Sequence, residues 1–327
     1  MLQQTTVNAV IPYYEKWVKI FPDVQSVSKA PLQKILNVWQ GLGYYQRVKN
    51  IQKAAKIICE QHAGKIPSDP LTLRKLPGFG PYTVGAVLSI AFDQRLPIID
   101  ANVRRVIMRY LALEGFADPF FDPQILDFLE KVQPQKRNNI FNQALMELGA
   151  LVCRNKESLC LICPLKDGCL AYEKGLQEII PTPKKRIITD VEVAIALIEK
   201  DGFYFIQQRP AKGLFADLWE FPGGKIEESE TAKEALYREV KEELNLAVVC
   251  ARELFAVEQF YTQFRARLHV FECELPSYPA ADRTHKWVSL KNILKYPMPS
   301  GSAKIVDKLF ALQKNLTSVK SYNILSP

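Results

Sequence analysis

The sequence predicts a chain of two domains, the first all-α and the second α+β. Its 327 residues are about twice a typical domain length of roughly 150 residues. Apolar residues recur at three- and four-residue spacing from Thr5 to about Ala171, and strand-like patterns follow. Between the two patterns, residues 180–186 combine two prolines with three cations, a composition typical of an exposed linker. The predicted domains are therefore 1–173 and 189–327, joined by a linker at 174–188.

Helices account for most of the expected structure before the linker. Short Pro and Gly breaks separate segments in which apolar residues repeat with the period of an amphipathic helix. The expected helices span residues 31–41, 48–62, 82–92, 103–113 and 139–151.

Strands dominate the pattern after the linker. Residues 191–198 and 203–208 are expected to form strands around an Asp201–Gly202 turn. Later strands are expected at 247–260 and 265–274, with one helix at 230–244 between the pairs. The second half is therefore expected to be α+β.

Composition and charge narrow the class of protein. Hydrophobic residues make up 48% and charged residues 24%, which excludes a wholly disordered, collagen-like or coiled-coil chain. The longest apolar run, residues 84–92, is shorter than the roughly 20 residues that a membrane span needs. With no basic-then-apolar leader at its start, the chain is expected to be cytoplasmic and to have no membrane partner.

The net charge of +8 is concentrated in the first half. Residues 1–180 hold 22 Lys and Arg against 16 Asp and Glu, a net charge of +6. Such an excess suits a nucleic acid, because Lys and Arg contacts to phosphates dominate that affinity. General solubility explains it equally well.

A glycine-rich turn separates two helical segments at residues 76–85. Gly78 and Gly80 would let the backbone approach a phosphate, towards which the first amides of the next helix would point. This is the arrangement of a helix-hairpin-helix grip on DNA. An ordinary turn between helices is the alternative.

Asp100 stands directly before the helical run at 103–113. It can be the N-cap of that helix. It can also be a pocket carboxylate that stabilises the cationic sugar formed as a glycosidic bond breaks. The sequence leaves both interpretations open.

Four of the seven cysteines lie within seventeen residues, at Cys153, Cys160, Cys163 and Cys169. A disulfide framework is not expected in a chain without an export signal, so the group is interpreted as a metal site. Zinc sites usually pair two short Cys knuckles across a longer gap. A compact loop with unequal spacings better suits a [4Fe–4S] cluster at 153–169.

Three carboxylates share one helix face in the second half. Glu239, Glu242 and Glu243 are spaced so that they could hold Mg²⁺ against a pyrophosphate. A solvated acidic face is the alternative.

Taken in order, these motifs resemble those of the MutY family of adenine DNA glycosylases, within the endonuclease III-like superfamily. The resemblance includes residues 2–5, residues 41–45, the hairpin, the Asp100 loop and the cysteine loop. Residues 219–224 and the acidic helix resemble the Nudix box of MutT-type hydrolases, and MutY enzymes end in a MutT-like domain. The implied fold is a helix-hairpin-helix glycosylase domain with an iron–sulphur loop, followed by an α+β Nudix-like domain.

The resemblance also implies an activity and a partner. MutY enzymes flip adenine mispaired with 8-oxoguanine or guanine out of double-stranded DNA and hydrolyse its bond to deoxyribose. Tyr82 stands where the lyases of the superfamily carry a Schiff-base lysine, so a monofunctional glycosylase is implied. The protein is expected to act as a monomer, associated with the nucleoid.

Several residues acquire roles from this resemblance. Asp100 would stabilise the oxocarbenium ion, with support from Tyr82. The residues that would contact DNA are Gln4 and Tyr44, as wedges in the opened stack, and Gly78 and Gly80, at phosphates. Tyr261, Thr262 and Gln263 would recognise the lesion, in the place where the family has Phe-Ser-His.

Two departures from the family pattern leave alternatives open. The family's Glu-Val-Met-Leu-Gln-Gln-Thr supplies a general acid that would lie two residues before Met1. Either an upstream segment carries that glutamate or the chain is an impaired lesion-binding protein. The box, with Asn245 in place of a glycine, is more intact than in most relatives, so a Mg²⁺-dependent hydrolase of oxidised nucleoside triphosphates is a further alternative.

Overall fold

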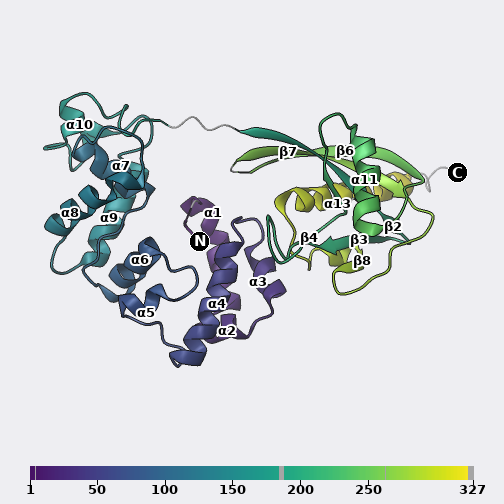
Figure 1. Ribbon diagram of the computed structural model, residues 1–327, viewed down its shortest axis with the longest axis horizontal. Coiled ribbons are helices and arrows are strands. Elements are labelled where there is room, and N and C mark those ends of the chain that lie inside the picture. The colour runs from purple at the N-terminus through teal and green to yellow at the C-terminus, as the bar shows by residue number, and fades with distance from the viewer. Residues whose placement is uncertain (4, 184–187, 262, 323–327) are drawn as a thin grey trace. The chain divides into compact units, whose positions relative to one another are not determined.

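The computed structural model describes residues 1–3, 5–183, 188–261 and 263–322 (Figure 1). The chain forms two compact units. One joins Met1–Gln52 with Arg186–Pro327, and the other is Lys53–Lys185. The division falls within helix α4 (Gln46–Gln61). The limits proposed from the sequence, 1–173 and 189–327, remain a prediction.

The unit Lys53–Lys185 is helical throughout its regular structure. After the end of α4 it contains α5 (Pro70–Arg74), α6 (Pro81–Phe92), α7 (Ala101–Tyr110), η1 (Pro119–Phe121), α8 (Asp122–Val132), α9 (Asn138–Leu151), η2 (Cys160–Ile162) and α10 (Leu170–Glu173). Its core forms around the apolar side of α7, where Val103, Ile107 and Met108 are buried. These side chains hold together the helices that carry the Asp100 and cysteine loops.

The other unit begins with α1 (Val7–Ile20), α2 (Val24–Lys29) and α3 (Leu32–Trp39). Trp17 of α1 packs edge-on against Trp39 of α3, with ring centroids 5.8 Å apart. Ile35 and Leu36 of α3 are fully buried, so this helix forms the apolar centre of the N-terminal part.

Residues 188–322 build two sheets and three helices. The strands are β1 (Thr189–Leu197), β2 (Glu199–Lys200), β3 (Phe203–Gln208), β4 (Trp219–Glu220), β5 (Gly223–Lys225), β6 (Cys250–Phe260), β7 (Phe264–Glu274) and β8 (His285–Ser289); the helices are α11 (Ala232–Leu244), α12 (Leu290–Ile293) and α13 (Ser300–Tyr322). One sheet has the order β5-β1-β7-β6 and the other β2-β3-β4, with β8 paired to β3. β1 runs parallel to β7, with Val193 opposite Leu268.

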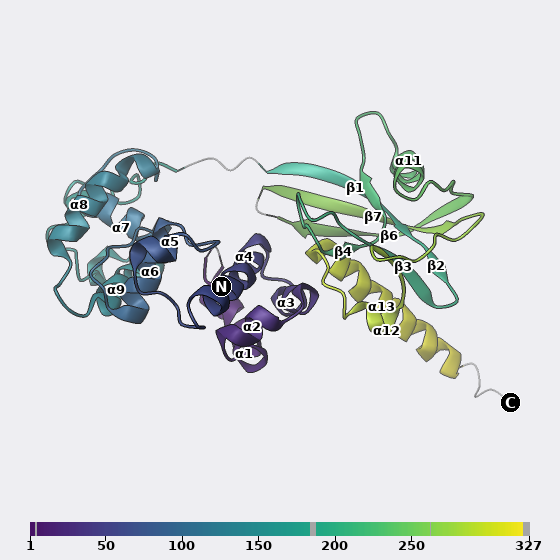
Figure 2. The ribbon, with the colours of Figure 1, turned by 60° about the horizontal axis from the view of Figure 1, so that its bottom comes forward.

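Alternation along β1 explains how helices cover both faces of the larger sheet (Figure 2). Ala194 and Ala196 point to one face and pack with α11. Ile195 and Leu197 point to the other and pack with the group that includes Ile305 of α13. This is the α+β arrangement predicted from the sequence.

The expected elements are confirmed to within a few residues. The five expected helices are α3, α4, α6, α7 and α9, and the later one is α11. The Asp201–Gly202 turn closes a hairpin between β2 and β3, whereas β1 lies in the other sheet, because the chain changes sheets between Leu197 and Glu199. None of the described helices combines the length and apolar character that crossing a membrane requires.

Candidate functional site

Asp100 is the N-cap of α7, as one interpretation of the sequence proposed. Its Oδ1 accepts a hydrogen bond of 2.7 Å from the backbone N–H of Val103. Its Oδ2 accepts a bond of 3.1 Å from Asn102 Nδ2. The residue is half-buried, so the cap leaves the carboxylate partly accessible. Capping and a role in a pocket are therefore compatible.

Two glycines set the position of the Asp100 loop. A Cβ on Gly85 of α6 would lie 2.8 Å from Ile98 Cγ2, just before Asp100. A Cβ on Gly149 of α9 would lie 2.6 Å from the Cβ of Asn102, just after Asp100. Real Cβ atoms do not approach other atoms so closely, so both positions require glycine. The loop is thereby held between α6 and α9.

Tyr82, in the first turn of α6, is electrostatically coupled to Asp100. Burial raises the pKa of the Tyr82 phenol, and the negative charge of Asp100 raises it further. The Tyr82 hydroxyl lies 3.7 Å from Met146 Sδ. The structure therefore brings both predicted catalytic residues into one region of the helical unit, and their roles remain a prediction.

The hairpin turn between α5 and α6 has the predicted shape. Gly78 has a φ of +84°, the left-handed conformation that favours glycine. Gly80 is the N-cap of α6 and, as a glycine, contributes no side chain to cap this helix end. Both glycines are exposed, so the first turn of α6 is open to an anion.

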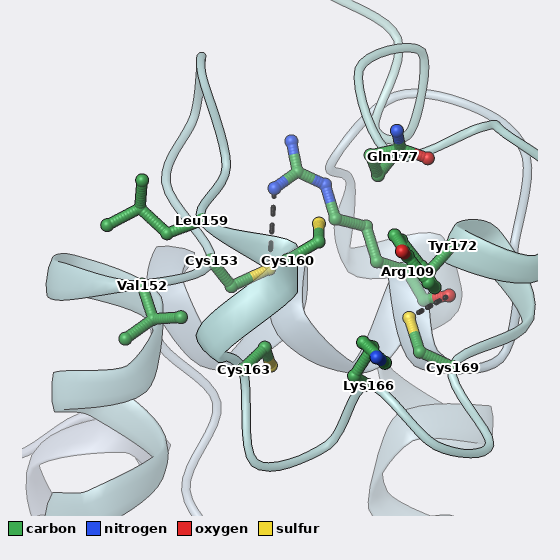
Figure 3. A pocket seen from close by; sticks show the side chains of 10 residues that line it. All are labelled: Arg109, Val152, Cys153, Leu159, Cys160, Cys163, Lys166, Cys169, Tyr172 and Gln177. Atoms are coloured by element: carbon green, nitrogen blue, oxygen red, sulfur yellow. Dashed lines mark hydrogen bonds between the residues drawn. The ribbon is translucent and has the colours of Figure 1, made fainter.

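The four clustered cysteines line one pocket (Figure 3). Cys153 follows α9, Cys160 begins η2, Cys163 follows η2, and Cys169 is the N-cap of α10. Burial raises the pKa of Cys160 and of Cys163, and neighbouring thiols raise both further. A group that supplies positive charge would offset this repulsion.

Four cysteine thiols are donors of the kind that a [4Fe–4S] cluster needs. No group of three or more His, Cys, Asp or Glu side chains in the described ranges is arranged to hold one metal ion. In a [4Fe–4S] cluster each cysteine binds a separate iron corner, so the four sulfurs surround the group without meeting at one point. Four thiols from one loop around one pocket suit that geometry.

Two buried arginines of α7, which the sequence analysis did not single out, organise this loop. Arg109 Nη1 donates to the carbonyl oxygen of Arg154 at 2.6 Å and lies 3.3 Å from Cys153 Sγ. Arg105 Nε donates to the Cys153 carbonyl at 2.9 Å, and its Nη2 donates to Asn102 Oδ1 at 3.0 Å. In the sequence, the signal for these two arginines is that charged residues recur on the buried side of a helix.

Of the two predicted wedge residues, Tyr44 lies in a tight turn before α4, and Gln4 lies outside the described residues. The Tyr44 side chain is 43% exposed and its backbone is left-handed, with a φ of +48°. The Arg47 guanidinium lies over its ring, 5.4 Å from the centroid. The turn therefore presents an aromatic ring to solvent.

The predicted lesion-recognition loop joins β6 to β7. Tyr261 is half-buried, and its hydroxyl accepts a bond of 3.2 Å from the backbone N–H of Gly301. Gln263 is exposed, and Thr262 lies outside the described residues. Tyr261 therefore belongs partly to the core, and Gln263 is the accessible member of the pair.

The three carboxylates predicted to hold Mg²⁺ lie on α11, and their contacts can be described one by one. Glu239 Oε1 accepts a bond of 2.7 Å from Arg238, and Glu243 Oε2 accepts one of 2.9 Å from the backbone N–H of Gly223. The Glu242 side chain is 60% exposed. Glu239 and Glu242 both pair with Arg238, so the predicted Mg²⁺ site at these carboxylates remains a prediction.

Comparison with known proteins identifies both parts of the chain. Residues 1–119 match the HhH-GPD superfamily of base excision DNA repair proteins, and residues 193–308 match the NUDIX domain family. The adenine DNA glycosylase of Buchnera aphidicola subsp. Schizaphis graminum is 32% identical over 94% of this chain and 88% of that protein. The chain belongs to the adenine DNA glycosylase family.

Adenine DNA glycosylases of mammals show a similar degree of identity. The adenine DNA glycosylase of Mus musculus is 30% identical over 86% of this chain and 64% of its own length. The Homo sapiens protein is 33% identical over 74% of this chain and 53% of its own length. The resemblance and the fold class predicted from the sequence are thereby confirmed.

Proposed function

We propose that the chain is a monofunctional DNA N-glycosylase of base-excision repair, which hydrolyses the bond between adenine and deoxyribose. Its substrate would be double-stranded DNA in which adenine faces 8-oxoguanine or guanine. The observation that carries the proposal is the placement of Asp100, which two glycines hold in a fixed loop beside Tyr82. Membership of the adenine DNA glycosylase family supports the substrate.

The fixed carboxylate is the centre of the proposed chemistry. Breaking the N-glycosidic bond places positive charge on deoxyribose, and a nearby carboxylate stabilises that charge electrostatically. The contacts of Asp100 with Val103 and Asn102 keep the carboxylate oriented before the sugar arrives. Tyr82 offers no amine for a Schiff base, so hydrolysis would end with release of the base.

DNA would be held by groups outside this centre. The open first turn of α6 at Gly78 and Gly80 would bind a phosphate, and Tyr44, together with Gln4, would enter the base stack. Residues 1–173 would extrude adenine while residues 189–327 inspect the opposite base through Tyr261 and its neighbours. One monomer would suffice for both tasks.

Cys153, Cys160, Cys163 and Cys169 would hold a [4Fe–4S] cluster in the pocket that they share. The cluster would tie together a loop that has little core of its own. Arg109 would support this loop through its bonds to backbone and side-chain oxygens near Cys153. The proposed role is structural, in shaping the loop for DNA docking.

One panel of assays tests the proposal. The chain is incubated with an A·8-oxoguanine duplex, an A·G duplex and, separately, an oxidised deoxyguanosine triphosphate with Mg²⁺. The same panel is run on a chain extended by Glu-Val before Met1, because the family pattern places its general acid there. Adenine release from the duplexes supports the proposal. Tight binding without release by both chains, or triphosphate cleavage alone, contradicts it.

A further inference from the structure

The turn at residues 41–44, which exposes Tyr44 to solvent, is held in place at both ends. Gly41 and Gly43 have φ values of +101° and +72°, and Tyr44 follows in the same left-handed region. A Cβ on Gly41 would lie 2.2 Å from the Tyr13 hydroxyl, so this turn packs tightly on α1. The Trp39 indole N–H donates to the carbonyl oxygen of Gly43 at 3.0 Å. The turn is therefore a defined, rigid feature.

The two residues that flank the turn bind the same distant residue. Gln40 Oε1 accepts a bond of 3.1 Å from the backbone N–H of Met298. The Tyr45 hydroxyl donates to the carbonyl oxygen of Met298 at 3.4 Å and also accepts from the N–H of Gly41 at 3.4 Å. Met298 and Tyr45 are 2% and 6% exposed. Because water has little access, both backbone polar groups of Met298 depend on these partners.

The segment that begins at Met298 also contacts Tyr261, one of the residues proposed to recognise the lesion. Three residues later, the N–H of Gly301 donates to the Tyr261 hydroxyl at 3.2 Å. A Cβ on Gly301 would lie 3.1 Å from that hydroxyl, so the end of the Tyr261 side chain packs directly against the backbone at Gly301. The Tyr261 ring also packs on Phe264, with centroids 4.7 Å apart. Movement of Tyr261 would therefore displace residues 298–301.

Further contacts keep this connection rigid. Gln33 and Asn37 are four residues apart on one side of α3, and Gln40 is the C-cap residue that follows the helix. Gln33 and Asn37 donate to the carbonyl oxygens of Asp217 and Leu294, at 3.1 and 3.0 Å. These amides hold α3 against the loops of the Nudix-like part, so the hydrogen bond to Met298 is one of several that fix this contact.

We propose that residues 298–301 couple the Tyr44 turn to Tyr261, and that Tyr45 and Gln40 are positioning residues for discrimination of the base opposite adenine. The inference rests on the proposed function. Binding of an oxidised guanine near Tyr261 would fix the segment, and the segment would fix the turn that enters the stack. When two sites restrain the same rigid element, binding at one site changes the affinity of the other by a coupling free energy. Here the coupling would favour duplexes that contact both the Tyr44 turn and Tyr261.

The test compares Tyr45→Phe and Gln40→Leu with the unsubstituted chain. Dissociation constants are measured for two duplexes that carry a non-cleavable adenosine analogue opposite 8-oxoguanine or opposite guanine. Loss of one buried hydrogen bond is worth roughly a fivefold change, so the ratio of the two constants should fall about fivefold in each variant. Tyr14→Phe, on an exposed tyrosine, and Gln143→Leu, on an exposed glutamine, are the matched controls and should keep the original ratio.

The ratio separates positioning from a merely structural effect. A variant that only destabilises the fold would weaken binding to both duplexes by the same factor and leave the ratio unchanged. If the unsubstituted chain discriminates and Tyr45→Phe and Gln40→Leu discriminate equally well, the coupling inference is wrong while the proposed function stands. If the unsubstituted chain binds the two duplexes equally, the proposed lesion reading fails and the coupling fails with it.

Discussion

Gly149 of α9 lies against Asn102 of α7 so closely that a Cβ at position 149 would stand 2.6 Å from the Cβ of Asn102. The same Cβ would lie 3.0 and 3.1 Å from the Cα and carbonyl carbon of Asn102. Backbone atoms cannot move aside as a flexible side chain can. The packing of two helices therefore fixes the residue that donates a hydrogen bond to Asp100.

Substitution of Gly149 by alanine should disturb the Asp100 loop. Overpacking of this kind costs about 1–3 kcal/mol, so we expect a lower free energy of unfolding and slower adenine release per folded molecule. Urea unfolding and single-turnover release measure the two effects. Gly80→Ala is the comparison variant, because a Cβ there would meet nothing within 4 Å; its only expected cost is that alanine is a poorer N-cap than glycine, so it should lose less stability than Gly149→Ala. Equal stability of both variants would show that α9 can shift freely.

Asp100→Asn separates the cap from the charge. Asparagine caps helices about as well as aspartate, so the free energy of unfolding should change by less than about 1 kcal/mol. Loss of a positioned electrostatic group should slow adenine release at least about 100-fold. Duplex binding should remain largely intact, and Asp100→Ala should lose both stability and activity. Unchanged release by Asp100→Asn would remove the carboxylate from the mechanism.

The cysteine pocket predicts a coloured protein. The purified chain should be brown, with broad visible absorption and bound iron, because thiolate-ligated iron–sulphur clusters absorb in that range. Cys160→Ser should lose the absorption, whereas Cys250→Ser, at an exposed position outside the pocket, should retain it. A colourless protein that carries zinc would contradict the proposed cluster.

The sequence predicted those features that depend on local pattern. Helical spacing identified α7 and α9, and alternation identified β1 and β7, because burial of one face imposes these periods. The contact of Gly149 with Asn102 could not be predicted, since it joins two helices through space. The partners of Glu239 and Glu243 were missed for a similar reason: their spacing shows a shared helix face, but not that an arginine and a backbone N–H occupy their oxygens.

Removing Asp217 and removing Lys49, which form an ion pair, should destabilise the chain by different amounts. Lys49 Nζ lies 2.6 Å from Asp217 Oδ2, and the side chains are 9% and 22% exposed. Asp217→Asn leaves a buried ammonium without its counter-charge, which should destabilise the chain by about 3 kcal/mol. Lys49→Met leaves a carboxylate that water can reach, so its cost should be clearly smaller. Urea midpoints measure the loss of stability in each variant. Equal losses would contradict the conclusion that Lys49 is more deeply buried than Asp217.

Arg265 and Asp190 provide the matched surface pair for this comparison. Their side chains are 46% and 62% exposed, with Nε and Oδ1 2.8 Å apart. An exposed pair contributes about 0–1 kcal/mol, so Arg265→Met should change the urea midpoint little.

His269 should make the stability of the Nudix-like part depend on pH. Its Nδ1 lies 2.9 Å from Glu253 Oε1 and its Nε2 lies 2.5 Å from Glu192 Oε2. Burial alone would lower the pKa of His269, but the hydrogen bonds and charges of these two carboxylates outweigh it and raise the pKa above its usual value. The imidazolium is therefore favoured by folding.

The sign of the pH effect follows from this raised pKa. The stabilisation is fully present below the unfolded pKa of about 6.5 and is lost as the pH rises through the higher folded pKa. The difference in unfolding free energy between the unsubstituted chain and His269→Gln should therefore be largest in mild acid and shrink in mild alkali. NMR titration of the His269 ring measures its pKa directly. In Glu192→Gln the pKa should move back towards 6.5, and a pKa that stays unchanged would show that Glu192 is not a source of the shift.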